Sequence, residues 1–262
     1  MTPKAIARLV ALALVAALLV SIAGCCPGAV RGSGNLETRQ MEFVDFTQVD
    51  VGNAFWVDVD RADTYQVSVT VDDNLWDYVD VHQTGQTLHI DLKGVHAFMN
   101  VHLEAHVTVP ALRGVALSGA SYGEVSGFSS TGPLNASVSG ASTLDIDGME
   151  AGDTVLDVSG ASKASGVIGI ADGDFEASGM STIELAGSAN NLSVEASGAS
   201  SVKLEGFVAE DIAIELSGAS TGTINASGTI DADLSGASHL DYGGGATLGT
   251  VSTSGGSTIE KK

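Results

Sequence analysis

The tetrapeptide Ser-Gly-Ala-Ser, or a close variant of it, recurs along this chain of 262 residues at intervals of 18 to 21 residues. Self-similarity at such a period is typical of proteins in which one structural unit stacks on the next. The copies define a repeat region, residues 114–262. They begin at Ser118, Ser139, Ser159, Ser178, Ser197, Ser217, Ser235 and Ser254.

Apolar and polar residues alternate around each copy. The positions one and three residues before the first serine are apolar in nearly every unit, as Val158 and Leu156 illustrate. Successive side chains of a β-strand point to opposite faces, so each unit has one dry face and one wet face. The wet position between the two apolar ones carries a carboxylate in five successive units: Asp157, Glu176, Glu195, Glu215 and Asp233.

This alternation predicts an all-β fold, a parallel β-helix or β-solenoid with coils of about 20 residues. A disordered linker would show no such parity, and helical repeats would place apolar residues at i, i+3 and i+4. The glycine and the last serine of the motif share the inward parity. We therefore expect a narrow coil there, with stacked serine hydroxyls bonding one another and no room for a larger residue than Gly198. The first serine and the alanine should form a flat outer strip.

Larger apolar residues and most of the aromatic residues occupy residues 35–113, which we expect to form a β-rich head that caps the solenoid. Alternation predicts strands at 47–51, 55–59 and 65–71, and two more near 88–92 and 101–109. The segment 72–76 begins with two aspartates and an asparagine, residue types that favour the start of a helical turn.

The N-terminus has the features of an export signal. Lys4 and Arg8 precede an apolar stretch over residues 9–20, which is shorter than the ~20 residues that span a bilayer. The tetrad that ends at Cys25 resembles a bacterial lipobox, and Cys26 fits that pattern less well. We expect residues 1–24 to be a lipoprotein signal peptide, Cys25 to carry the lipid, and residues 25–34 to be a flexible tether. The protein would then be exported and lipid-anchored in the cell envelope, at the outer membrane or the cell surface.

The composition narrows the classes of partner. Eleven Lys and Arg stand against 32 Asp and Glu, and the net charge of −21 repels phosphate backbones, which argues against nucleic acid. The two cysteines are adjacent at the predicted cleavage site, so the folded part has no disulfide, no thiol nucleophile and no thiolate metal site. Nothing in the sequence indicates a cofactor.

Several groups are candidates for chemistry. The five repeat carboxylates should lie in register, where they form a candidate cation ladder, although solvation alone could accommodate them. Trp56, Trp76 and Tyr78 are candidate glycan contacts. His102 and His106 would lie about 13 Å apart on one strand, too far for a shared metal. Two Gly-x-Ser-x-Gly matches belong to the repeat and lack the following helix that a hydrolase nucleophile needs.

The succession of segments in the head resembles the head GIN-domain family, whose label is auto-transporter adhesin. The segments that carry the resemblance are 34–36, 46–52, 67–69, 73–75, 88–90 and 108–112, which runs into the first repeat at 117–121. The resemblance implies a right-handed, single-stranded parallel β-helix on a bacterial surface lipoprotein. It supplies no catalytic residues. The chain ends at Lys262 without the membrane-barrel strands of a true autotransporter.

These features together predict a non-catalytic, adhesin-like module that presents rigid acidic faces. Its expected partners are the membrane, through the lipid, and a surface glycan or protein, and a homo-oligomer fits the flat edges of a solenoid. The alternative is a protein that binds or cleaves polysaccharides. Cleavage needs two acids about 5–9.5 Å apart in a cleft, or basic residues, and the repeat has few basic or aromatic residues.

Overall fold

The computed structural model describes residues 29–94 and 96–262. Two compact units are distinguished. The first includes β1 (Val30–Arg31) and β8 (Phe98–Met99), which pair in parallel. The second, residues 32–94 and 101–262, contains all the other strands. The predicted signal peptide and Cys25 lie outside the described residues.

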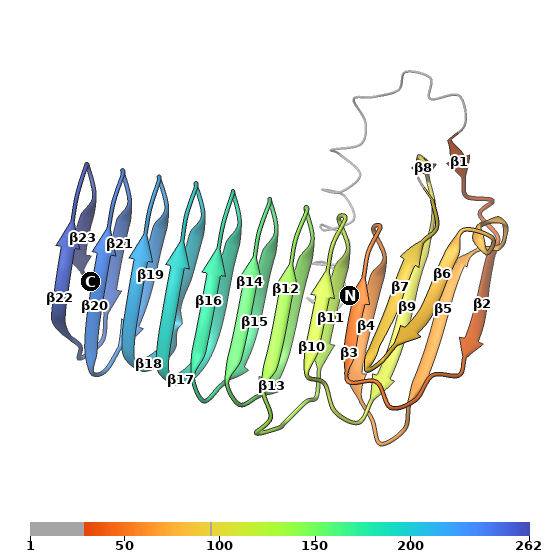
Figure 1. The fold of residues 1–262 in the computed structure, drawn as a ribbon, viewed down its shortest axis with the longest axis horizontal. Helices are drawn as coiled ribbons and strands as arrows, with labels where there is room; N and C mark the ends of the chain where they lie inside the picture. The colour runs from red at the N-terminus through yellow and green to blue at the C-terminus, as the bar shows by residue number, and fades with distance from the viewer. Residues whose placement is uncertain (1–28, 95) are drawn as a thin grey trace, which may run out of the picture. The chain divides into compact units, whose positions relative to one another are not determined.

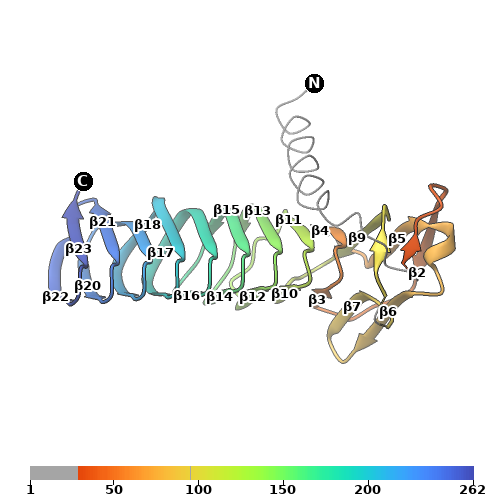
Figure 2. The same cartoon turned by 90° about the horizontal axis from the view of Figure 1, so that it is seen from above.

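The second unit is a parallel β-solenoid, as the alternation predicted (Figure 1). Each coil has two strands joined by the Ser-Gly-Ala-Ser turn, so the strands form two facing layers (Figure 2). Sheet I contains the strands before the turn and sheet II those after it, and β17 and β18 bend from sheet II into sheet I. The strands of the repeat are β10 (Gly114–Leu117), β11 (Tyr122–Ser126), β12 (Leu134–Val138), β13 (Thr143–Glu150), β14 (Thr154–Val158), β15 (Lys163–Gly169), β16 (Gly173–Ala177), β17 (Thr182–Ala196), β18 (Ser201–Leu216), β19 (Thr221–Ala226), β20 (Thr229–Leu234), β21 (His239–Gly243), β22 (Thr247–Thr253) and β23 (Thr258–Lys261).

The predicted strands of residues 35–113 are present, as is the short helical turn η1 (Asp73–Leu75). Of these strands, β3 and β4 continue the parallel register of β10 and β11, so the coil stack includes a coil from this part of the chain. Antiparallel pairing begins beyond that coil, where β5 pairs with β2 and β9, and β6 pairs with β7. The bounds are β2 (Leu36–Met41), β3 (Gln48–Val51), β4 (Trp56–Arg61), β5 (Gln66–Asp72), β6 (Val79–Thr84), β7 (Thr87–Leu92) and β9 (Leu103–Val109).

The core lies between the two sheets and consists of stacked inward side chains. Leu156, Phe175, Val194 and Ile214 occupy equivalent positions in four successive coils, and none is more than 2% exposed. The ring of Phe175 also contacts that of Phe207, edge to face, from the opposite side of the core. Burial of this continuous apolar column holds the coils together without cross-links.

A buried carboxylate fixes the backbone where the two units meet in the sequence. Asp72 is 2% exposed and accepts hydrogen bonds from the backbone N–H groups of Gly34 and His102, each at 2.7 Å. These two residues begin the return of the chain into β2 and β9. Charge-assisted bonds of this kind compensate for the burial of the carboxylate.

The motif serine behaves partly as predicted. It is buried in seven coils, at Ser121, Ser142, Ser162, Ser181, Ser200, Ser220 and Ser238. The hydroxyl donates mainly to the carbonyl three residues earlier in its own turn, as Ser200 does to Ser197 at 2.8 Å. A contact between neighbouring hydroxyls is found between Ser181 and Ser200, at 3.4 Å. The serine therefore stabilises the turn of its own coil more than it joins successive coils.

The prediction that the motif glycine points inward is wrong. Gly198 is exposed and has φ +76°, a left-handed conformation that side chains disfavour. A β-carbon there would lie 2.5 Å from the carbonyl oxygen of Gly179 in the preceding coil. The chain reverses at this point, so the alternation of the strand does not extend across it. Glycine is required for turn geometry and coil-to-coil approach, rather than for a narrow interior.

We expect Gly198→Val to destabilise the protein by about 2–4 kcal/mol, because it adds a branched side chain to a left-handed turn and forces two coils apart. Ala199→Val, at the neighbouring exposed position, is the matched control and should change stability little. Thermal and denaturant unfolding of both variants measures the difference. Equal unfolding midpoints would contradict this role for the glycine.

Candidate binding face

The structure places the five repeat carboxylates in a single row on the exposed face of sheet I. Parallel register pairs Asp157 with Glu176, Glu176 with Glu195, Glu195 with Glu215, and Glu215 with Asp233. All five side chains belong to exposed residues. We call this set the carboxylate row. Its members are separated by about 4.8 Å, the spacing of neighbouring strands.

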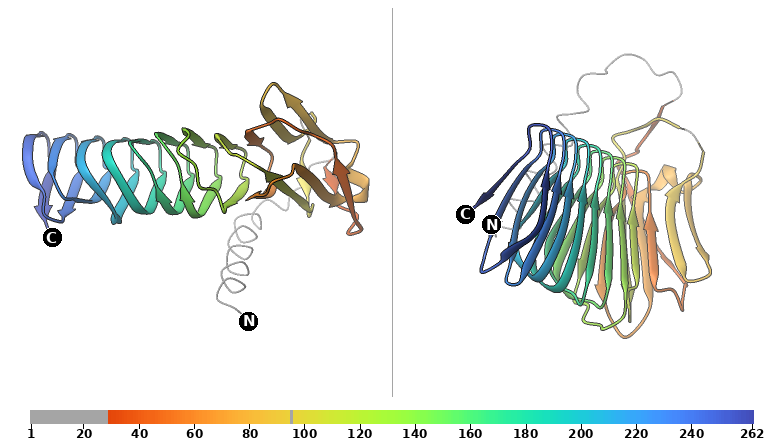
Figure 3. Two further views of the ribbon diagram at one scale, coloured as in Figure 1. Left: turned by 90° about the horizontal axis from the view of Figure 1, so that it is seen from below. Right: turned by 60° about the vertical axis from the view of Figure 1, so that its left-hand side comes forward.

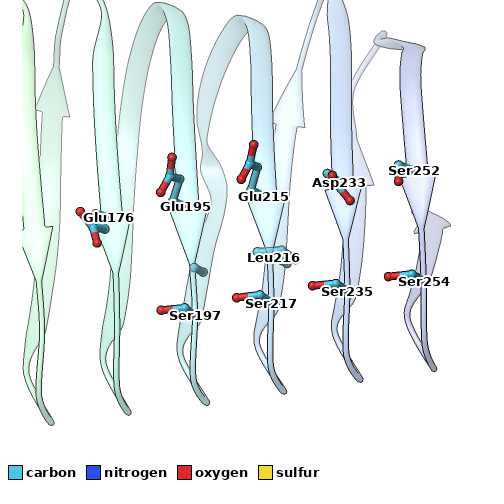
Figure 4. A pocket seen from close by; sticks show the side chains of 11 residues that line it. Glu176, Glu195, Ser197, Glu215, Leu216, Ser217, Asp233, Ser235, Ser252 and Ser254 are labelled. Atoms are coloured by element: carbon cyan, nitrogen blue, oxygen red, sulfur yellow. The ribbon is translucent and has the colours of Figure 1, made fainter.

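A shallow hollow of about 440 Å³ lies over part of the carboxylate row. Glu176, Glu195, Glu215 and Asp233 line it, and a second, parallel row of hydroxyl groups lies beside them (Figure 4). These hydroxyls belong to the first serines of the motif, Ser197, Ser217, Ser235 and Ser254, whereas Ser252 follows Asp233 in the register of the carboxylate row. The face therefore presents acceptors and hydroxyl groups at one regular repeat.

The two sheets differ in how their charges are compensated. On sheet II, Glu184 forms an ion pair with Lys163 at 2.9 Å, and the hydrogen bond from that ammonium lowers the pKa of Glu184. Near the last coil, Asp241 contacts Lys262 at 2.6 Å, and this bond lowers the pKa of Asp241. Within residues 29–94 and 96–262, no ion pair is found for any member of the carboxylate row. Sheet I is consequently the face with uncompensated negative charge.

The carboxylate row extends into the head through residues that the sequence analysis did not connect with it. Ser137 and Ala116 continue the register from Asp157, and Asp50 and His89 follow on β3 and β7. His89 Nδ1 lies 3.1 Å from a carboxylate oxygen of Asp50. The sequence contains an indication of this extension. The alternating residues 49–51 are followed by Gly-Asn-Ala, which is a divergent form of the repeat turn. A second hollow of about 410 Å³ covers this part of the face.

The candidate glycan residues do not form one cluster. Trp56 lies on the outer face of β4, where its ring stacks on that of Tyr122 with 4.0 Å between centroids. Trp76 instead packs beneath Arg39, whose guanidinium carbon is 4.2 Å from the ring centroid. Arg39 pairs with the buried Val69 and so shares its inward parity. Trp76 therefore lies over the head core and Trp56 on an outer face, while Tyr78, which is half-buried, follows η1.

The other candidates for chemistry also separate. His102 lies 2.9 Å from Glu104, and His106 lies 3.7 Å from Asp60, so the two histidines have different carboxylate neighbours. Among the described residues, no group of three or more His, Cys, Asp or Glu side chains is arranged to hold a metal ion. Ser121 and Ser220, the central serines of the two Gly-x-Ser-x-Gly matches, are at most 2% exposed and donate to backbone carbonyls. Neither is an exposed nucleophile.

The fold and this face define a class: a repetitive parallel β-solenoid whose sheet I carries an exposed row of carboxylates. Comparison with known families is consistent with that class. The chain belongs to the family described as "Putative auto-transporter adhesin, head GIN domain", whose model matches residues 45–246. No curated protein matches the chain.

Solved structures share the fold. The chain is similar to a putative adhesin from Parabacteroides merdae, with 19% identity, a TM-score of 0.83, and coverage of 90% of this chain and 99% of the other. A putative adhesin from Parabacteroides distasonis is 18% identical, with a TM-score of 0.83 and coverage of 89% and 100%. A protein from the same organism described as a putative lipid binding protein is 19% identical, with a TM-score of 0.80 and coverage of 89% and 99%.

No helix in the part of the chain that the structure describes is both long enough and apolar enough to cross a membrane.

The uncompensated charge of the carboxylate row should be measurable as a salt effect. We expect Glu195→Gln, at the centre of the row, to raise the melting temperature by about 1–3 °C at low ionic strength. The substitution removes the repulsion between Glu195 and its two neighbours in the row, Glu176 and Glu215. The gain should vanish in molar salt, which screens exposed charges. Glu184→Gln, which removes an ion-paired carboxylate on sheet II, is the control and should not stabilise the protein. A salt-independent gain at Glu195 would contradict the interpretation.

Proposed function

We propose that the protein is a non-catalytic, adhesin-like module of the cell envelope that binds its partner through the carboxylate row of sheet I. The observation that carries the proposal is the in-register row of five exposed carboxylates, for which no ion-pair partner is found in the part of the chain that the structure describes. Membership of a family described as adhesins supports the same role.

The mechanism is multivalent contact along a rigid surface. Five successive coils each offer one carboxylate with a serine two residues later, and the stack repeats this pair at the strand spacing. Each contact between exposed charges is weak, but several contacts made by one rigid face act at high effective concentration. A partner with regularly spaced cationic or hydroxyl groups, on a protein or a glycan, matches this arrangement.

Divalent cations are a second way to occupy the row. Carboxylate oxygens are the ligands that Ca²⁺ prefers, and a bound cation would reduce the repulsion between neighbouring members. If cations bind, the carboxylate row is the cation ladder that the sequence analysis considered, and calcium ions connect its carboxylates to acidic groups on a surface glycan.

The alternative function, binding or cleavage of a polysaccharide at the aromatic residues, has one specific observation in its favour. The stacked rings of Trp56 and Tyr122 lie on an outer face, and Trp56 Nε1 donates to Asp58 at 3.2 Å. Each ring covers one face of the other, however, which reduces the aromatic surface that a sugar could stack on. Trp76 offers less still, because Arg39 lies over its ring.

One screen separates these functions. The purified protein is tested against immobilised polysaccharides and proteins, with calcium or with a chelator, and both retention and product release are recorded. The variants are a triple change in the row (Glu176→Gln, Glu195→Gln and Glu215→Gln), a triple change on sheet II that removes the same charge (Glu124→Gln, Asp145→Asn and Glu260→Gln), and Trp56→Ala.

We expect the row variant to lose retention by about tenfold or more, since multivalent binding multiplies the loss at each site, while the sheet II variant binds normally. Loss of retention in Trp56→Ala alone would support the alternative. Product release that disappears on changing one carboxylate would overturn the non-catalytic proposal. Retention that fails only in the chelator would assign the row to cations.

The location is a separate proposal: the protein is exported and held at the membrane by a lipid on Cys25. The motif that ends at this cysteine supports it. We expect cells that express the protein to incorporate a labelled fatty acid into it, and we expect Cys25→Ser to abolish the labelling. Cys26→Ser is the matched control and should be labelled normally. Labelling that follows Cys26 instead would contradict the assignment.

A further inference from the structure

The last coil of the solenoid differs from every other coil in its burial. Leu248 on β22 is 41% exposed, whereas its register partner in the preceding coil, Ile230, is fully buried. Val251 is 39% exposed, whereas its partner Ala232 is 5% exposed. These side chains have the inward parity of the core column, but no strand within residues 29–94 and 96–262 lies on their outer side. In the ribbon, the last coil has a coil stacked on one side only (Figure 3, right), and its inward-parity side chains Leu248 and Val251 are exposed.

The backbone is open at the same place. Among the described strands, β22 pairs only with β20 and β23 only with β21, so each strand has one edge whose N–H and C=O groups no described strand pairs with. Two adjacent edges, one in each sheet, are exposed together. Edges of this kind are templates for pairing with another chain unless charge, proline or a cover protects them. β22 contains neither a charged residue nor proline, whereas β23 ends in Glu260 and Lys261, so β22 is the less protected of the two edges.

The opposite end of the stack is protected. Its edge strand β2 runs antiparallel to β5 and carries Glu37 and Arg39 at inward-parity positions, joined by an ion pair of 2.8 Å. Arg39 also covers Trp76. Charged side chains on an edge oppose further pairing, so a second copy cannot extend the stack from this end. Head-to-tail association through β2 is thereby disfavoured, whereas the uncharged edge of β22 can pair with the same edge of a second copy.

The charge distribution agrees with association at the open end. Residues 243–262 contain one Glu and two Lys, a side-chain charge of +1, although the whole chain carries −21. Two copies that meet at their last coils would thus bring together segments that contain one acidic residue each, and would keep the carboxylate rows apart. Side-by-side contact would instead oppose the acidic faces directly.

We propose that two copies of this chain associate through their last coils in a two-fold dimer. A two-fold axis perpendicular to the sheets sets β22 antiparallel to the partner's β22 and β23 antiparallel to the partner's β23. Both sheets then continue across the junction, and the exposed Leu248 and Val251 of each copy enter a shared core. The interface is isologous and closed, so it stops at two copies.

Sedimentation velocity on the purified full chain, in one detergent and over about a hundredfold range of concentration, tests the dimer by mass action. We expect a monomer that converts to a dimer, and nothing larger, as concentration rises. We expect Val251→Lys to weaken dimerisation by about tenfold or more, because each copy would bring an unpaired ammonium into the junction. Val167→Lys, at a 51% exposed valine of the mid-stack strand β15, is the control and should dimerise normally.

Circular dichroism is used to check that each variant is folded. If Val251→Lys does not fold, Leu248→Lys is tested in its place. A protein that stays monomeric at every concentration overturns the proposal. So does an association that both end variants leave intact, or one that Val167→Lys weakens equally, because another surface is then responsible. A monomer that forms a stable complex only with a different protein would assign the open end to that partner and also overturn the dimer.

Discussion

The rest of the structure depends on the parallel register between successive coils. Backbone hydrogen bonds between coils align equivalent positions, so any residue type that the repeat favours becomes a continuous row. The apolar positions produce the buried column that includes Phe175 and Val194. The polar position between them produces the carboxylate row on the outer face. Stability and the candidate binding surface therefore both result from the parallel register, which aligns the inward side chains of each strand in one row and its outward side chains in another.

The turn chemistry keeps that register constant from coil to coil. Glycine permits the left-handed conformation at Gly198, and the hydroxyl of Ser200 closes the turn on the carbonyl of Ser197. The folded part has no cysteine with which to cross-link its coils. A coil that changed its length at this turn would shift its side chains to the wrong faces, with the loss of both rows. Conservation of the tetrapeptide from unit to unit within this chain is thus explained by geometry, without a catalytic role for its serines.

The faces and ends of the solenoid are not equivalent, and this asymmetry directs the functional proposals. Charges on sheet II are partly neutralised, as Lys163 and Glu184 show, while sheet I carries an uncompensated row. One end is closed by antiparallel strands with charged edges, while the other exposes Leu248 and Val251. The proposed binding surface and the proposed dimer interface are therefore compatible, because they use different parts of the same stack.

The sequence by itself determined the coil, its length and the composition of its rows, because alternation within a strand and a constant interval between turns are both local properties. It also placed the five carboxylates at equal positions, which only had to be stacked to form a row. The tertiary structure alone decided what depends on chain reversal or on distant neighbours. Counting residues across the turn assigned Gly198 to the interior, although the alternation ends where the backbone reverses. Three other features depend on which strands become neighbours, which the spacing of residues in the sequence does not indicate. They are the separation of Trp56 from Trp76, the burial of Asp72 between two distant N–H groups, and the exposure of Leu248 in the last coil.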